Sequence, residues 1–178
     1  MSDSESELIG RKHQELQALA YFTKKKLDFE YDTSDIPEFE SVIRIRPDFL
    51  FRGEVNVIVE IDENAHAGYS PDDEVLRMKT IWKAFDKNVV FIRLAVDRSK
   101  ELSGRILKDV YHMILEYQSL TDTRSRLVVH YVNYPSKELE KYRRYNSDVN
   151  IVNFKDDEDD IEDDDDDDIE DDFEDDDD

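Results

Sequence analysis

VIRIRPDFLFRGEVNVIVEID (42–62) is the stretch of sequence that decides the fold. Apolar and polar residues alternate in 42–51, residues 52–54 include a glycine that favours a tight turn, and a second apolar run follows in 55–62. Because successive side chains of a strand point to opposite faces, Glu60 and Asp62 share one face of the second strand. Carboxylates are costly to bury without a counter-charge. The stretch therefore predicts a β-hairpin with an acidic pair that needs a partner.

Helical and strand patterns continue on both sides of this hairpin. Apolar residues recur at helical spacing in several segments, and Ser70 and Pro71 favour a helix start. Residues 28–41 are irregular, with a short strand around 29–31. The expected elements are helices at 7–27, 70–85, 100–119 and 136–147, and strands at 88–96 and 126–133. The run at 88–96 is apolar enough for a central strand buried on both faces. This order predicts an α/β domain with a mixed β-sheet flanked by helices.

The negative charge of the chain is concentrated in one segment. The 178 residues are typical of one domain and carry a formal net charge of -23. Residues 156–178 hold twenty acidic residues and no basic one, whereas residues 1–155 hold 27 acidic and 24 basic side chains. The sequence therefore predicts a near-neutral domain at 7–154 and a disordered acidic tail at 155–178. Such a tail solubilises the chain, recruits a basic protein partner, or competes with nucleic acid for the domain's basic surface.

The composition also bounds the compartment and the class of metal site. The chain has no cysteine, which rules out disulfides and thiolate metal ligands. No apolar run approaches the length that spans a bilayer, and the start MSDSESE (1–7) does not have the pattern of a signal peptide. We expect a soluble, intracellular protein of the nucleus or cytoplasm, with no membrane association.

The hairpin brings a third carboxylate toward the acidic pair. A turn about Gly53 sets Asp48 opposite residues near Val59 and Glu60, so the carboxylates of Asp48, Glu60 and Asp62 converge. Oxygen ligands of this kind suit Mg²⁺ or Mn²⁺, and such an ion activates water and polarises a phosphodiester. The competing interpretation is that these are ordinary surface carboxylates near a strand end.

Several motifs of this chain resemble the PD-(D/E)xK nuclease superfamily, in the branch related to very-short-patch-repair endonucleases. The matching residues are RPDF (46–49), VEIDENAH (59–66), Arg77 and VVFIRLAVD (89–97), and the resemblance covers about residues 7–134. It implies a restriction-endonuclease-like fold. The branch includes small bacterial and large-DNA-virus domains, which extends the expected location to a virus-infected cell.

The resemblance also implies roles for individual residues. Asp48 and Glu60 match the metal-binding acids, and a glutamate on the first helix, here Glu15, can join such a site. Asp62 stands where the superfamily name places a lysine, and close relatives also have E-x-D followed by a histidine. Asp62 is then a third ligand, His66 a general base or acid, and Arg77 the source of the missing positive charge. The alternatives are a structural hydrogen bond for His66, a salt bridge from Arg77 to Asp73 or Asp62, and, for Glu15, a solvated position on the flank of the helix, which is the interpretation that we favour.

Basic residues near the hairpin are candidates for phosphate contacts. Arg44 and Arg46 share the strand face of Asp48, and Arg52 lies in the turn. Further candidates are Arg93, Arg98 and the run Lys24–Lys26. No zinc finger, helix-turn-helix or RNA-binding signature is present, so the sequence does not reveal which DNA is recognised.

Three functions remain open at this point. The leading hypothesis is an enzyme, a Mg²⁺- or Mn²⁺-dependent endonuclease or nickase that hydrolyses phosphodiester bonds of DNA. The second is a catalytically inactive nucleic-acid-binding module with the nuclease fold. The third is an interaction protein that recruits a basic partner through its acidic tail.

Overall fold

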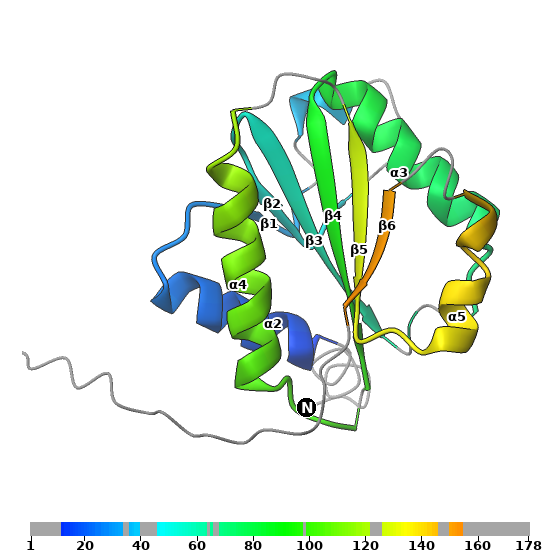
Figure 1. Ribbon diagram of the computed structural model, residues 1–178. Coiled ribbons are helices and arrows are strands. Elements are labelled where there is room, and N and C mark those ends of the chain that lie inside the picture. Colours follow the sequence, from blue (N-terminus) through cyan, green and yellow to red (C-terminus); the bar gives the residue numbers. More distant parts are fainter. Residues whose placement is uncertain are drawn as a thin grey trace, which may run out of the picture.

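The computed structural model describes residues 12–33, 36–39, 46–63, 65, 68–97, 99–121 and 126–145, and the backbone of 150–154. Within these residues the chain forms an α/β domain in which α-helices cover both faces of a mixed sheet (Figure 1). The predicted fold class is confirmed at this level. None of the described helices is long and apolar enough to cross a membrane. The predicted tail at 155–178 lies outside the described residues.

The strands lie in the sheet in the order in which they occur in the sequence. β1 (Glu30–Tyr31), β2 (Phe49–Phe51) and β3 (Val55–Glu63) form an antiparallel unit. β4 (Asn88–Val96) and β5 (Leu127–Val132) continue parallel to β3, and the backbone of β6 (Asn150–Phe154) lies parallel to β5. Phe49 pairs with Val59 and Leu50 with Ile58, which confirms the hairpin.

Four described helices cover the sheet, two on each face (Figure 1). Both α2 (His13–Lys24) and α4 (Gly104–Gln118) pack on one face, where Phe22 of α2 meets the rings of Phe49 and Phe51 edge-on. The other face is covered by α3 (Pro71–Phe85) and α5 (Ser136–Glu140). Short 3₁₀ helices, η1 (Pro37–Phe39) and η3 (Arg143–Tyr145), lie outside these layers.

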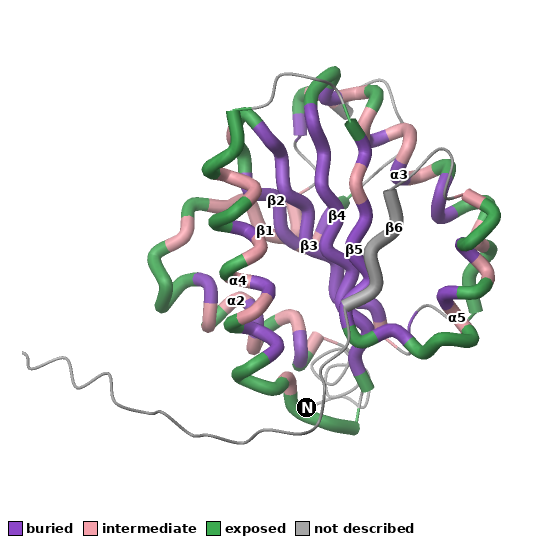
Figure 2. The backbone as a smooth tube through the Cα atoms, viewed as in Figure 1, coloured by how far each residue is buried: buried purple, intermediate pink, exposed green. Residues whose placement is uncertain are grey.

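The sheet has a hydrophobic layer on each side. Val57 and Val59 belong to the layer under α2 and α4, whereas Ile58 belongs to the layer under α3. By alternation, Glu60 and Asp62 face α3. All nine residues of β4 are buried, which confirms its central position (Figure 2). A charged side chain on the α3 face of β3 or β4 is therefore inside the core and needs a charged partner there.

Several element bounds differ from the sequence-based expectation. Of the strand expected at 42–51, the described part is only Phe49–Phe51, and residues 40–45 lie outside the described residues. The described part of the first helix ends at Lys24, and Lys26 has a φ of 55°, so the chain turns before Leu27. The helix expected at 136–147 divides into α5 and η3, and β6 is an addition. Ser70 precedes α3, but its side chain does not cap it.

Candidate active site

Asp48 and Glu60 lie side by side where the hairpin opens. Asp48 directly precedes β2, and the pairing of Phe49 with Val59 places it next to Glu60 of β3. The backbone N–H of Ile61 donates a hydrogen bond to Asp48 Oδ2 at 2.7 Å, which fixes the carboxylate against β3. Glu60 is buried and Asp48 is half-buried. The hairpin register therefore places these two carboxylates next to each other, as predicted.

Burial makes the charged forms of both carboxylates unfavourable. Burial, followed by the charge of Glu60, raises the pKa of Asp48 to about 8, and the N–H of Ile61 offsets only part of this. Burial also raises the pKa of Glu60, against the effect of the positive charge of Arg77. Glu15 on α2 adds to the rise at Asp48, which places this helix glutamate near the pair. A positive charge at this point would stabilise both carboxylates.

Arg77 supplies one positive charge to the pair. It extends from the second turn of α3, and its Nη2 lies 2.9 Å from Oε1 of Glu60. Its side chain retains 27% of its exposure, compared with 7% for the side chain of Glu60. The sequence left a salt bridge to Asp73 or Asp62 as the alternative for Arg77. The structure instead shows a salt bridge to Glu60.

Asp62 does not join Asp48 and Glu60, contrary to our expectation of three converging carboxylates. Arg93 of β4 donates to both oxygens of Asp62, from Nε at 2.7 Å and from Nη2 at 3.0 Å. Tyr134 donates its hydroxyl to Oδ2 of the same carboxylate. The side chains of Asp62 and Arg93 are 1% and 0% exposed. The reason is the parallel pairing of β3 with β4, which places Arg93 beside Glu60, one step from Asp62.

A second carboxylate holds Arg93 from the helix side. Glu74 of α3 lies 2.5 Å from Nη1 of Arg93. Burial lowers the pKa of Arg93, but the negative charges of Asp62 and Glu74 outweigh it and the pKa is raised well above its ordinary value. The buried group therefore ties β3, β4 and α3 together. Arg93 was among the candidates for phosphate contacts, and its complete burial removes it from that role.

Asp48 and Glu60 have the donor chemistry that a magnesium ion prefers. No group of three or more Asp, Glu or His side chains within the described residues is arranged to hold a metal ion. Mg²⁺, however, keeps several waters and is usually bound through one or two carboxylates together with substrate phosphates. The hydrogen bonds from Ile61 and Arg77 use one oxygen each of Asp48 and Glu60. The second oxygen of each carboxylate therefore remains for an ion.

Acidic and basic side chains lie together on the α3 side of the sheet. Four carboxylates gather there against two guanidinium groups: Asp48, Glu60, Asp62 and Glu74 against Arg77 and Arg93. Burial is the main cause of the raised pKa of Asp48, and the neighbouring charge of Glu60 adds to it.

Two basic side chains flank Asp48 on the side of β1. Arg46 is 53% exposed and its Nε lies 2.5 Å from Asp32 Oδ1, while Lys12 Nζ lies 2.8 Å from Asp32 Oδ2. The N–H of Asp32 donates to the carbonyl of Asp48 at 2.9 Å, so these cations are anchored next to the acidic pair. Sequence reasoning included Arg46 and missed Lys12, because nothing in the sequence pairs residue 12 with residue 32.

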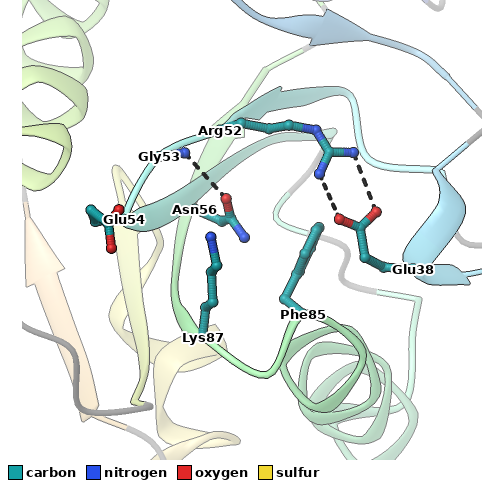
Figure 3. A pocket seen from close by; sticks show the side chains of 7 residues that line it. All are labelled: Glu38, Arg52, Gly53, Glu54, Asn56, Phe85 and Lys87. Atoms are coloured by element: carbon teal, nitrogen blue, oxygen red, sulfur yellow. Dashed lines mark hydrogen bonds and ion pairs between the residues drawn. The ribbon is translucent and has the colours of Figure 1, made fainter.

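Arg52 lies at the other end of the hairpin. Its guanidinium bonds Glu38 at 2.7 and 3.3 Å and lies near the ring of Phe85 (Figure 3). It also contacts Glu30. With Gly53, Asn56 and Lys87, among others, it lines a cavity of about 400 Å³ next to the start of β3. The hairpin therefore separates Arg52 from Asp48. Arg44, His66 and Arg98 lie outside the described residues, and their predicted roles stay predictions.

The further partners of the buried Asp62–Arg93 pair, Tyr134 on Asp62 and Glu74 on Arg93, were also missed from the sequence. In the sequence, Glu74 is part of an expected helix start, and Tyr134 lies just after an expected strand. The signal for a buried ion pair was the single arginine in the otherwise apolar run 88–96. A comparison with protein-family models, with curated protein sequences and with solved structures finds no match for this chain.

Proposed function

We propose that this protein is a metal-dependent phosphodiester hydrolase that acts on DNA as an endonuclease or nickase. Asp48 and Glu60 are the carboxylates that hold the Mg²⁺ or Mn²⁺ ion. The observation that carries the proposal is their side-by-side position at the opening of the hairpin, where burial raises the pKa of both carboxylates. The resemblance of RPDF (46–49) and VEID (59–62) to the PD-(D/E)xK superfamily supports the same residues and a restriction-endonuclease-like fold.

The chain's own groups divide the work at such a site. A bound Mg²⁺ ion activates a water molecule and stabilises charge on the phosphate. The guanidinium of Arg77, next to Glu60, donates to a non-bridging phosphate oxygen, which is the task that a lysine performs in the superfamily motif. Arg46 and Lys12 hold a neighbouring phosphate of the same strand. Asp62, bound to Arg93, keeps β3 in register with β4 rather than binding the ion.

Plasmid nicking tests the proposal directly. Supercoiled plasmid is incubated with Mg²⁺ or Mn²⁺ and with the wild-type protein, Asp48→Asn or Asp28→Asn. The amide oxygen introduced by Asp48→Asn still accepts the hydrogen bond from Ile61, so this variant removes the charge without removing the backbone contact. Asp28 is an exposed aspartate between α2 and β1 and serves as the matched control. We expect nicking by the wild type and by Asp28→Asn, and its loss in Asp48→Asn and in EDTA.

A catalytically inactive nucleic-acid-binding module is the second candidate. The observation that favours it is the burial of Asp62 against Arg93, which places a neutralised pair where the superfamily motif has a lysine. In that case the wild type binds duplex DNA in a salt-dependent manner and leaves the plasmid intact with either ion. Nicking that persists in Asp48→Asn would contradict the assignment of the site itself.

A further inference from the structure

The salt bridge between Arg77 and Glu60 occupies the same carboxylate that the proposed ion requires. Arg77 Nη2 lies 2.9 Å from Glu60 Oε1, and Glu60 lies beside Asp48. The positive charges of a guanidinium and a divalent cation repel each other when both lie next to the same carboxylate. Both therefore compete for the charge of Glu60, and the metal-free protein meets part of its need for positive charge from its own helix.

The two arginines of the cluster differ in their freedom to move. Arg93 is 0% exposed and is held by both Asp62 and Glu74, so it has a fixed position. The side chain of Arg77 is 27% exposed and bonds to Glu60 at its inner end. Glu74, one turn earlier on α3, is already bound to Arg93. Because its side chain is partly exposed, an Arg77 that leaves Glu60 is available to a DNA phosphate.

We propose that Arg77 acts as an internal placeholder for the cation: it neutralises Glu60 in the metal-free protein, and metal binding releases its guanidinium to a DNA phosphate. This inference rests on the proposed metal site at Asp48 and Glu60. It makes metal binding and DNA binding cooperative, because each ligand relieves the cost of the other. It also predicts two opposite effects of the Arg77 side chain, which weakens binding of the ion and strengthens binding of DNA.

Calorimetric titration with Mn²⁺ alone tests the first effect. Arg77→Gln removes the competing charge, so we expect it to bind Mn²⁺ roughly tenfold more tightly than the wild type, the effect of one partly buried ion pair. Lys83→Gln is the matched control, because Lys83 is an exposed cation on the same helix and its loss changes the net charge equally. Arg77→Lys keeps a competing cation, and its Mn²⁺ affinity should stay near that of the wild type.

Binding of a duplex oligonucleotide tests the second effect. Affinity is measured with and without Ca²⁺, which takes the same oxygen ligands as Mg²⁺. We expect Ca²⁺ to tighten DNA binding about tenfold in the wild type and in Lys83→Gln, and about threefold or less in Arg77→Gln. Thermal unfolding of each variant shows that it is folded. If Arg77→Gln does not fold, Arg77→Lys still tests the inference. Its retained positive charge should give nearly wild-type behaviour in both assays.

The outcomes separate the inference from the function on which it rests. An Arg77→Gln variant that binds Mn²⁺ no more tightly than Lys83→Gln, while Asp48→Asn loses Mn²⁺ binding, would overturn the placeholder role and leave the metal site standing. A wild type that binds no Mn²⁺ at millimolar concentration, like Asp48→Asn, would instead overturn the proposed function. Tighter Mn²⁺ binding together with weaker Ca²⁺-dependent DNA binding supports both.

Discussion

Arg93 donates to both carboxylate oxygens of Asp62 across the β3–β4 pair, at 2.7 and 3.0 Å, in a part of the core that water does not reach. This relationship separates Asp62 from the two acids that precede it on the hairpin. It also shows that the cluster has two parts. Asp62, Arg93, Glu74 and Tyr134 form one part, which is buried throughout, and Asp48, Glu60 and Arg77 form the other, in which Arg77 is partly exposed.

The first prediction is that Asp62→Asn affects stability rather than metal binding. Removing one partner of a buried ion pair leaves the other charge uncompensated, so we expect a loss of about 3 kcal/mol in the free energy of unfolding. Denaturant unfolding measures this, and Asp73→Asn, an exposed change at the start of α3, is the control. Mn²⁺ affinity of the folded variant should match the wild type. Loss of Mn²⁺ binding with unchanged stability would restore Asp62 as a ligand.

The sequence predicts the parts of this site that depend on local patterns, and it misses the parts that depend on contacts between distant strands. Alternation in 42–62 fixes the hairpin, and the hairpin alone brings Asp48 to Glu60. Alternation also places Asp62 on the same face as Glu60, but it does not say which of them meets a neighbouring strand's cation. That choice depends on the register of β4, thirty residues further along the chain, where Arg93 lies opposite Glu60 and beside Asp62. Contacts of this range leave no local signal.

The same limit explains the assignment of the arginines. The sequence places three arginines in or near strands but does not show how exposed each side chain is. The exposed fractions are 53% for Arg46, 40% for Arg52 and 0% for Arg93. Arg93 lies in a run of apolar residues, which favours burial. Arg52 follows β2 by one residue, where its neighbours Glu30 and Glu38 come from separate segments. The sequence identifies these basic residues, but only the three-dimensional arrangement shows how exposed each one is.

The second prediction concerns the pH dependence of stability in the metal-free protein. The pKa of Asp48 is about 8 in the folded chain and 3.8 as an ordinary value, so the folded state retains a proton that the unfolded state releases. Stability from this group is therefore complete below about pH 4 and is lost as the pH rises toward 8. Asp48→Asn does not ionise, and we expect it to exceed the wild type by about 2 kcal/mol at pH 8.5 and by much less at pH 5.

Thermal unfolding in EDTA at pH 5, 7 and 8.5 measures this difference. The expected result is a gap in melting temperature that widens with pH, in favour of Asp48→Asn. Saturating Mg²⁺ should close the gap at pH 8.5, because the ion stabilises the ionised wild-type carboxylate. A pH-independent gap would mean that Asp48 does not titrate in this range.

The third prediction distinguishes Arg46 from Arg52 in DNA binding. Arg46 lies next to Asp48 through Asp32, whereas Arg52 bonds Glu30 and Glu38 at the far end of the hairpin. We expect Arg46→Gln to weaken DNA binding and to reduce the slope of affinity against salt concentration by about one. Arg52→Gln should leave both the affinity and the slope unchanged. Fluorescence anisotropy over a salt series measures both quantities, and an equal loss in the two variants would move the DNA path to the turn of the hairpin.

The last prediction concerns the acidic segment that follows β6. The sequence predicts that 155–178 is disordered, and residues 156–178 carry a charge of -20, whereas residues 1–155 are nearly neutral. A tail that is disordered as predicted and tethered after Phe154 would have a high effective concentration near the basic side chains Lys12 and Arg46. It therefore competes there with DNA phosphates, and most strongly at low salt, where screening is least.

Truncation after Phe154 removes the tail and leaves β6 intact. We expect the truncated chain to bind duplex DNA more tightly and with a steeper salt dependence, because more counterions are released on binding. Its thermal stability should stay nearly unchanged, since a disordered segment buries little surface. A chain with a neutral Gly/Ser tail of the same length is the control, and it should bind DNA like the truncation, because charge rather than bulk causes the competition. Equal affinities of all three proteins at low salt would show that the tail does not mask the domain and would leave it the roles of solubilising the chain or recruiting a basic partner.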